Sequence, residues 1–213
     1  PVSGIWQTVW MEAVPEKRVE SIRITPDLAG ITLQVEAGCA QVQVCIPGVG
    51  EQTVPSGQPV RMDVPQPHLW TVEDPHLYAL HITAGEDRVE SYFALRTVEV
   101  RGNRILLNGE PVFLNGVLDQ GYFQEGIFLP ESPEGYADDV RRMKALGFNM
   151  LRKHIKVEPE AFYYACDRLG MLVMQDMVNS GPYNFLLDTA LPTIGITKRP
   201  LLPAGEKRKQ VFK

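Results

Sequence analysis

The sequence predicts two kinds of fold in one chain, a β-sandwich followed by an α/β unit with a parallel sheet. In the first half, short segments alternate apolar and polar residues, and Pro, Gly, Asn or Asp stands between them. After residue 100, two helical segments alternate with short segments that are continuously apolar. Apolar strands between helices are typical of a parallel sheet. We therefore expect a multi-domain protein with a β part and an α/β part.

Six alternating segments predict the strands of the sandwich. Their short spacing is that of an antiparallel sandwich, and no helical period interrupts them before residue 130. In chain order they cover residues 19–27, 30–37, 39–48, 58–65, 76–84 and 88–100. Ahead of them, residues 4–12 predict a lone strand with Trp6 and Trp10 on one face, where packing is favoured over ligand contact.

The α/β part begins with a hairpin over residues 104–117, because Asn108-Gly109 is a strong turn signal. Ser132 as N-cap and Pro133 as first helical residue predict a helix that ends at Gly147. Its expected apolar stripe consists of Tyr136, Val140, Met143 and Leu146. A strand over 148–152, a second helix from Glu158-Pro159-Glu160 to Gly170 and a strand over 171–174 follow.

The strand–helix–strand–helix–strand order allows two architectures. One is a small open sheet, and the other is the beginning of a (β/α)8 TIM barrel. A complete barrel needs about 250 residues, so the part of the chain after residue 100 would supply about three strands of it.

Composition and charge narrow the function classes. Hydrophobic residues make up 44% of the chain and charged residues 22%, as in globular proteins. The net charge of −5 argues against a nucleic-acid or membrane-surface partner, and no window resembles a membrane-spanning helix. Cys39 and Cys45 would lie about 20 Å apart on one strand, too far for a disulfide. Reduced thiols favour a cytoplasmic location over a secreted one, although the sequence carries no targeting signal that fixes the compartment.

Polar residues follow all three strands of the expected parallel sheet. Asp119 and Gln120 come after the first strand, Arg152 and His154 end the second, and Asp176 follows the third. Since the carboxyl ends of parallel strands gather at one edge, these side chains form a candidate site. The alternative for Arg152 and His154 is a structural ion pair, and the alternative for Asp176 is a helix cap or structural partner. His68, His76 and His81 lack ligand spacing, so we expect no metal, and nothing indicates a cofactor.

Motifs in family order along nearly the whole chain resemble glycoside hydrolase family 2, which contains β-galactosidases, β-glucuronidases and β-mannosidases. They are SGIWQTVWME, LWTVEDPHLYALHI, SYFALRTVEVRGNRILLNGEPVFLNGV, DVRRMKALGFNMLRKH and DRLGMLVMQDM. The resemblance implies three parts. Residues 1–14 would be the tail of a jelly-roll sugar-binding domain, 15–100 an immunoglobulin-like sandwich, and 101–213 the N-terminal part of a TIM-barrel catalytic domain.

The resemblance also implies roles. Arg152 looks like the family arginine that supports the carboxylate of the catalytic nucleophile, and His154 would lie near the sugar. Relatives often have Arg-x-x-His-Tyr-Pro where this chain has Arg152-Lys153-His154-Ile155-Lys156, an Asp-Glu pair in place of Gln175-Asp176, and a glycine at Ala94. These departures leave the substrate sugar open.

Both catalytic residues of the family are glutamates on later barrel strands, the acid/base directly after an Asn. The chain contains no Asn-Glu dipeptide. We therefore expect both glutamates beyond Lys213, in a retaining glycoside hydrolase whose substrate is an oligosaccharide or other β-glycoside, and we expect this chain to be inactive by itself.

Two alternatives belong to other classes, a non-catalytic carbohydrate-binding module and a structural interaction module. A barrel with three strands would also expose a parallel edge and an apolar face. We expect either a second copy of the chain or residues 179–203 to cover them.

Overall fold

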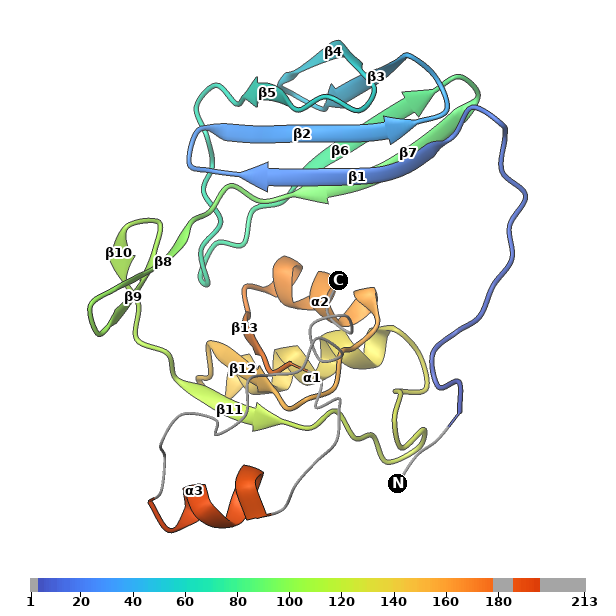
Figure 1. The fold of residues 1–213 in the computed structure, drawn as a ribbon. Helices are drawn as coiled ribbons and strands as arrows, with labels where there is room; N and C mark the ends of the chain where they lie inside the picture. The colour runs from blue at the N-terminus through green and yellow to red at the C-terminus, as the bar shows by residue number, and fades with distance from the viewer. Residues whose placement is uncertain (1–3, 178–185, 196–213) are drawn as a thin grey trace.

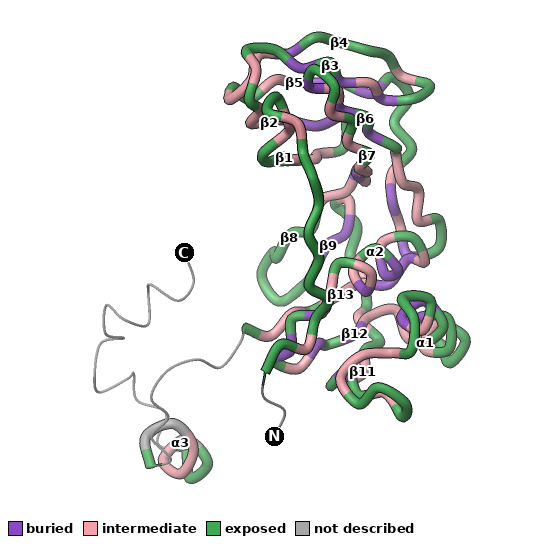
Figure 2. Tube along the Cα trace, turned by 90° about the vertical axis from the view of Figure 1, so that its right-hand side faces the viewer, coloured by how far each residue is buried: buried purple, intermediate pink, exposed green. Residues whose placement is uncertain are grey.

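The computed structural model describes residues 4–177 and 186–195 (Figure 1). Two antiparallel sheets pack at one end of the molecule, and a parallel sheet with two helices forms the other. Residues 4–17 form a largely exposed connection along one side, without a strand (Figure 2). The strand predicted over residues 4–12 is therefore wrong. It would need a neighbour for its backbone groups, and the described residues give it none.

The sandwich has three strands in one sheet and four in the other. The first sheet has the order β1 (Val19–Pro26), β2 (Gly30–Ala37), β5 (Val60–Asp63). The second has the order β4 (Gly50–Pro55), β3 (Gln41–Ile46), β6 (Tyr78–Ala84), β7 (Asp87–Phe93). All neighbouring pairs are antiparallel. The predicted β-sandwich is confirmed.

The core of the sandwich follows the alternation in the sequence. Alternate residues of β2, β3 and β6 point between the sheets, and nine of them are at most 1% exposed: Ile31, Leu33, Val35, Val42, Val44, Ile46, Leu80, Ile82 and Ala84. Strand β4 was missed because it is an edge strand, in which only Val54 is buried. Without a repeated apolar position it carries no period-2 signal.

A small hairpin sheet joins the two ends of the molecule. It contains β8 (Val98–Arg101), β9 (Arg104–Leu107) and β10 (Glu110–Pro111). The segment predicted as one strand over 88–100 is thus divided between β7 and β8. Asn108 and Gly109 both have positive φ, 55° and 84°, as a tight hairpin turn requires. The predicted turn is confirmed.

The α/β part runs β11 (Gly116–Asp119), α1 (Glu134–Ala145), β12 (Met150–Lys153), α2 (Glu160–Leu169), β13 (Leu172–Gln175). The strands pair in parallel in chain order. Val117, Leu151 and Val173 stand in one row and pack against the helices. The next row, Leu118, Arg152 and Met174, faces the other way and is exposed.

Two details of the helices differ from expectation. Ser132 accepts a hydrogen bond through its backbone carbonyl, and the N-terminus of α1 has no side-chain cap. Leu146 is 70% exposed, because it lies just past α1 and its side chain leaves the packed face.

Residues Leu186–Ala190 (a π-helical turn) and α3 (Leu191–Thr193) complete the described chain. The cover expected from residues 179–203 falls largely outside the described residues. Among the described helices, none is long and apolar enough to cross a lipid bilayer.

Trp70 ties the sandwich to the helices. It lies in the loop between β5 and β6, is fully buried, and donates a 2.6 Å hydrogen bond from Nε1 to the carbonyl oxygen of Asp167 in α2. The guanidinium of Arg96 lies 4.5 Å from the Trp70 ring centroid and pairs with the Asp167 carboxylate at 3.0 Å. Nearby, Lys144 Nζ bonds the carbonyl oxygens of Val72, at 2.8 Å, and of Leu169, at 2.6 Å. Trp70 and Lys144 thus join this loop to the helices through part-buried hydrogen bonds.

We expect Trp70→Phe to lower the free energy of unfolding by about 2 kcal/mol, because it removes ring volume and leaves a buried carbonyl without its donor. Urea unfolding followed by far-UV circular dichroism measures the change. The matched control is Trp10→Phe, at a position 74% exposed. An equal effect of the two variants would contradict the role of Trp70 in connecting the sandwich to α2.

Candidate functional site

The carboxyl ends of β11, β12 and β13 lie side by side, and alternation along the strands divides their side chains between two faces. Asp119, Lys153 and Gln175 stand in one row, and Leu118, Arg152 and Met174 in the row before it. Since neighbouring residues of a strand point to opposite faces, Lys153 points toward the helices and Arg152 toward the open face of the sheet.

On the open face, Arg152 pairs with Asp176. Arg152 Nε lies 3.0 Å from Asp176 Oδ1, and the side chains are 53% and 20% exposed. The described residues give the two terminal nitrogens of Arg152 no partner. A guanidinium that keeps its outer donors free can hold a further carboxylate in bidentate fashion.

On the helix face, Asp119 belongs to a buried charge cluster. Its carboxylate accepts hydrogen bonds from Lys153 Nζ, at 2.8 Å, and from the backbone N–H of Gly121, at 2.7 Å. Lys153 Nζ also lies 2.6 Å from Glu158 Oε1, and the side chains of Lys153 and Glu158 are 1% and 0% exposed. The ammonium of Lys153 further lies 4.5 Å from the Phe162 ring centroid. Each oxygen of the Asp119 carboxylate therefore has a partner, while 28% of the side chain is exposed.

Lys156 completes the cluster from the loop after β12. Its Nζ lies 2.8 Å from Glu158 Oε1 and donates to the carbonyl oxygens of Gly121, at 2.7 Å, and Phe128. Burial lowers the pKa of Lys156, while the bond to Glu158 opposes that shift. Lys156 thus fastens the loop after β11 to the loop after β12.

Tyr136 of α1 faces the same carboxylate. Its hydroxyl donates to Glu158 Oε2 at 3.4 Å, and burial, followed by the charge of Glu158, raises the pKa of Tyr136. The hydroxyl therefore remains a donor at neutral pH, and it adds a contact from α1 to the cluster.

The backbone between Lys153 and Lys156 is strained. Ile155 has φ of 50°, a conformation that β-branched residues rarely adopt, and Lys156 N bonds the carbonyl oxygen of His154 across it at 2.7 Å. Strain of this kind costs about 1–3 kcal/mol and tends to cluster at functional sites. The buried amine of Lys156 supplies contacts that can hold the turn in place.

Next to this turn lies a hollow with a volume of about 770 Å³. His154 and Gln120 line it, together with Trp6, Tyr122 and Phe128. The Trp6 and Phe128 rings meet edge to face at 5.1 Å, and Tyr122 meets Phe128 at 5.6 Å. Polar side chains among aromatic rings can bind a sugar, whose hydroxyls need partners and whose C–H faces pack on rings.

The five residues predicted as a site thus lie in three places. Arg152 and Asp176 meet on the open face, Gln120 and His154 share the hollow, and Asp119 lies in the charge cluster. Sequence reasoning missed Lys153, Lys156 and Glu158. The sequence could have indicated Lys153, because Arg152 and Lys153 are neighbours on one strand and must point to opposite faces. Within residues 4–177 and 186–195, no three His, Cys, Asp or Glu side chains are grouped so as to hold a metal ion.

Residues 17–96, the sandwich, match the family Glycosyl hydrolases family 2. The sandwich of this chain therefore belongs to this family. The chain is 28% identical to a β-galactosidase of Aeromonas hydrophila subsp. hydrophila in a match that covers 82% of this chain and 20% of that protein. A β-galactosidase of Pectobacterium atrosepticum is 36% identical over 55% of this chain and 12% of its own length. The chain therefore spans about a fifth or less of the length of these relatives.

Solved structures agree with the family. A β-glucuronidase of Faecalibacterium prausnitzii superposes with a TM-score of 0.69 and 30% identity over 77% of this chain and 28% of that one. A β-D-glucuronidase of Dictyoglomus thermophilum superposes with a TM-score of 0.71 over 80% of this chain and 31% of its own. At 21% identity, the second match supports the fold alone.

We expect Glu158→Gln to lower the free energy of unfolding by about 3–5 kcal/mol, because it leaves two buried ammonium groups without their shared anion. Urea unfolding measures the loss. The control is Glu125→Gln, an exposed change in the loop after β11. Adding Lys156→Met to Glu158→Gln should recover part of the loss, since it removes one of the uncompensated charges. A cost no larger than that of the control would contradict the cluster's role.

Proposed function

We propose that the chain is part of a retaining glycoside hydrolase that acts on β-glycosides. In this proposal residues 15–100 are an immunoglobulin-like sandwich and residues 101–213 supply the first strands of a (β/α)8 catalytic barrel, after a jelly-roll tail in residues 1–14. The family match, the relatives named β-galactosidase and β-glucuronidase, and the parallel order of β11, β12 and β13 support it.

The observation that carries the proposal is the geometry of Arg152. It stands at the carboxyl end of a parallel strand and faces away from the covering helices, and within the described residues only its Nε is paired, with Asp176. Barrel enzymes place their active sites at this end of the strands. We propose that Arg152 holds the nucleophile's carboxylate ionised and oriented, and that Gln120 and His154 contact sugar hydroxyls.

The two aspartates at the strand ends fit a supporting role better than a catalytic one. A retaining mechanism needs an acid/base and a nucleophile about 5–5.5 Å apart. Asp119 is engaged by Lys153 and a backbone N–H, and Asp176 by Arg152. Under the proposal, the catalytic glutamates belong to later strands of a longer protein, and the chain alone is inactive. Association of two copies through the open sheet edge stays a prediction.

Hydrolysis of a panel of nitrophenyl β-glycosides, by this chain and by a full-length protein that contains it, tests the proposal. We expect activity on a β-sugar from the full-length protein alone, because only that protein would hold both carboxyl groups. Activity of the 213-residue chain would mean that Asp119 or Asp176 acts in catalysis, and each would then be changed to Asn. Millimolar oligosaccharide binding without hydrolysis by either protein would favour a binding module.

In the full-length protein we expect Arg152→Lys to lower kcat about 100-fold or more, since a single ammonium cannot replace a bidentate guanidinium. The acidic limb of the kcat/KM profile should also move to higher pH, because the nucleophile loses hydrogen bonds that favour its ionised form. The control is Arg142→Lys on the exposed face of α1. An unchanged pH profile with an unchanged kcat would contradict the assigned role.

A further inference from the structure

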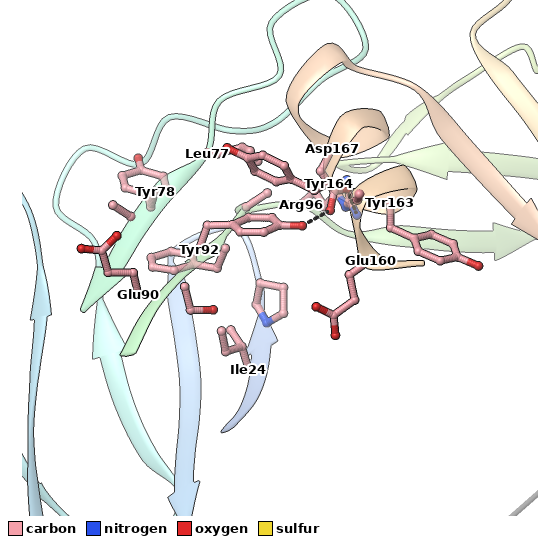
Figure 3. A pocket seen from close by; sticks show the side chains of 16 residues that line it. Ile24, Leu77, Tyr78, Glu90, Tyr92, Arg96, Glu160, Tyr163, Tyr164 and Asp167 are labelled. Carbon is pink, nitrogen blue, oxygen red and sulfur yellow. Dashed lines mark hydrogen bonds and ion pairs between the residues drawn. The ribbon is translucent and has the colours of Figure 1, made fainter. Parts of the chain in front are cut away.

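A second cavity lies between the sandwich and helix α2, separate from the residues at the strand ends (Figure 3). Its volume is about 970 Å³, near the upper end of the roughly 300–1,000 Å³ that is usual for small-molecule sites. Strand β1 contributes Ile24 and Pro26, β7 contributes Glu90–Phe93, and α2 contributes Glu160, Tyr163, Tyr164 and Asp167. Clefts between domains are favoured positions for ligands.

The contact between β7 and α2 fixes one wall of this cleft. Tyr92 donates a hydrogen bond from its hydroxyl to Asp167 Oδ2 at 3.1 Å (Figure 3), and Arg96 pairs with the other carboxylate oxygen at 3.0 Å. Burial raises the pKa of Tyr92, so the hydroxyl stays a donor at neutral pH. Asp167 also belongs to the tie made by Trp70. The cleft is therefore shaped before any ligand enters.

Two kinds of group remain available in the cleft. Tyr164 lies 5.0 Å from the Tyr92 ring and 5.6 Å from the guanidinium of Arg168, yet 43% of the residue is exposed. Glu90 and Glu160 are exposed lining residues, and no ion pair or hydrogen bond to their carboxylates exists within the described part of the chain. Figure 3 shows the two carboxylates on opposite sides of Tyr92, and neither joins the Tyr92–Asp167 bond.

These groups match the chemistry of a neutral sugar chain. The face of an aromatic ring is electron-rich and packs against the C–H face of a pyranose, and free carboxylates accept hydrogen bonds from its hydroxyls. Uncompensated carboxylates would repel an acidic sugar. We propose that this cleft is an accessory binding site for neutral β-linked oligosaccharides, away from the proposed active site. The ligand class rests on the proposed function.

Isothermal titration of the 213-residue chain with neutral β-linked gluco-, manno-, xylo- and galacto-oligosaccharides tests this site. We expect saturable binding of at least one, and we expect Tyr164→Ala and Glu160→Ala each to weaken it about threefold to tenfold. The control for lost aromatic area is Phe113→Ala, at an 84% exposed position outside the cleft, and it should leave binding unchanged. An oligosaccharide that ends in a uronic acid should bind more weakly than its neutral counterpart.

Three outcomes overturn the site. They are the absence of saturable binding, equal binding by Tyr164→Ala and the unchanged chain, and a loss of binding on Tyr122→Ala alone, which would place the sugar in the hollow at the strand ends. Circular dichroism and thermal unfolding establish that each variant is folded. The proposed function fails separately: a full-length protein inactive on every β-glycoside, with Tyr164-dependent binding intact, would retain the accessory site and reject the hydrolase.

Discussion

The candidate site depends on the ion pairs that the buried carboxylate of Glu158 makes with Lys153 and Lys156. This carboxylate is fully buried, and its Oε1 lies within 2.8 Å of two lysine amines whose charges could not otherwise be kept inside the protein. Isolated buried charges are unfavourable by several kcal/mol, so the two amines and the carboxylates of Glu158 and Asp119 persist only together. Each comes from a different position around the strand ends. Together they connect β11, β12, the loop between β11 and α1, and the approach to α2.

This cluster explains how a strained turn can be held beside the hollow. Lys156 contacts Glu158 and the carbonyl oxygen of Gly121 where the chain turns after His154, and Ile155 takes a positive φ in this turn. The unfavourable backbone conformation is offset by buried ionic contacts a few ångströms away. The position of His154 on the rim therefore depends in part on Glu158, which holds Lys156 but does not itself line the hollow. Buried charge thus fixes the geometry of a surface site.

The sequence predicted the elements with strong periodicity and missed features that depend on distant partners. Alternation in β2, β3 and β6 and the Asn108-Gly109 turn are local signals, and both match the structure. Strand β4 has a single buried residue, and residues 4–12 alternate without a neighbouring strand, so local pattern misjudged both. The pairing of Arg152 with Asp176 spans 24 residues and that of Lys153 with Asp119 spans 34. No local pattern in the sequence encodes such pairs. Alternation along β12 does predict that Arg152 and Lys153 point to opposite faces of the sheet.

The choice of cation on each face of β12 follows from what that face must do. Lys153 has a compact ammonium with three donors. Two carboxylates and an aromatic ring surround this ammonium, so its charge is compensated inside the protein. Arg152 has a planar group with five donors, and the described residues occupy one edge of it through Asp176. A lysine there would offer all its donors from one nitrogen, whereas the arginine keeps two terminal nitrogens that can pair with a second carboxylate in bidentate fashion. One strand thus separates a charge that maintains structure from a charge that remains available for chemistry.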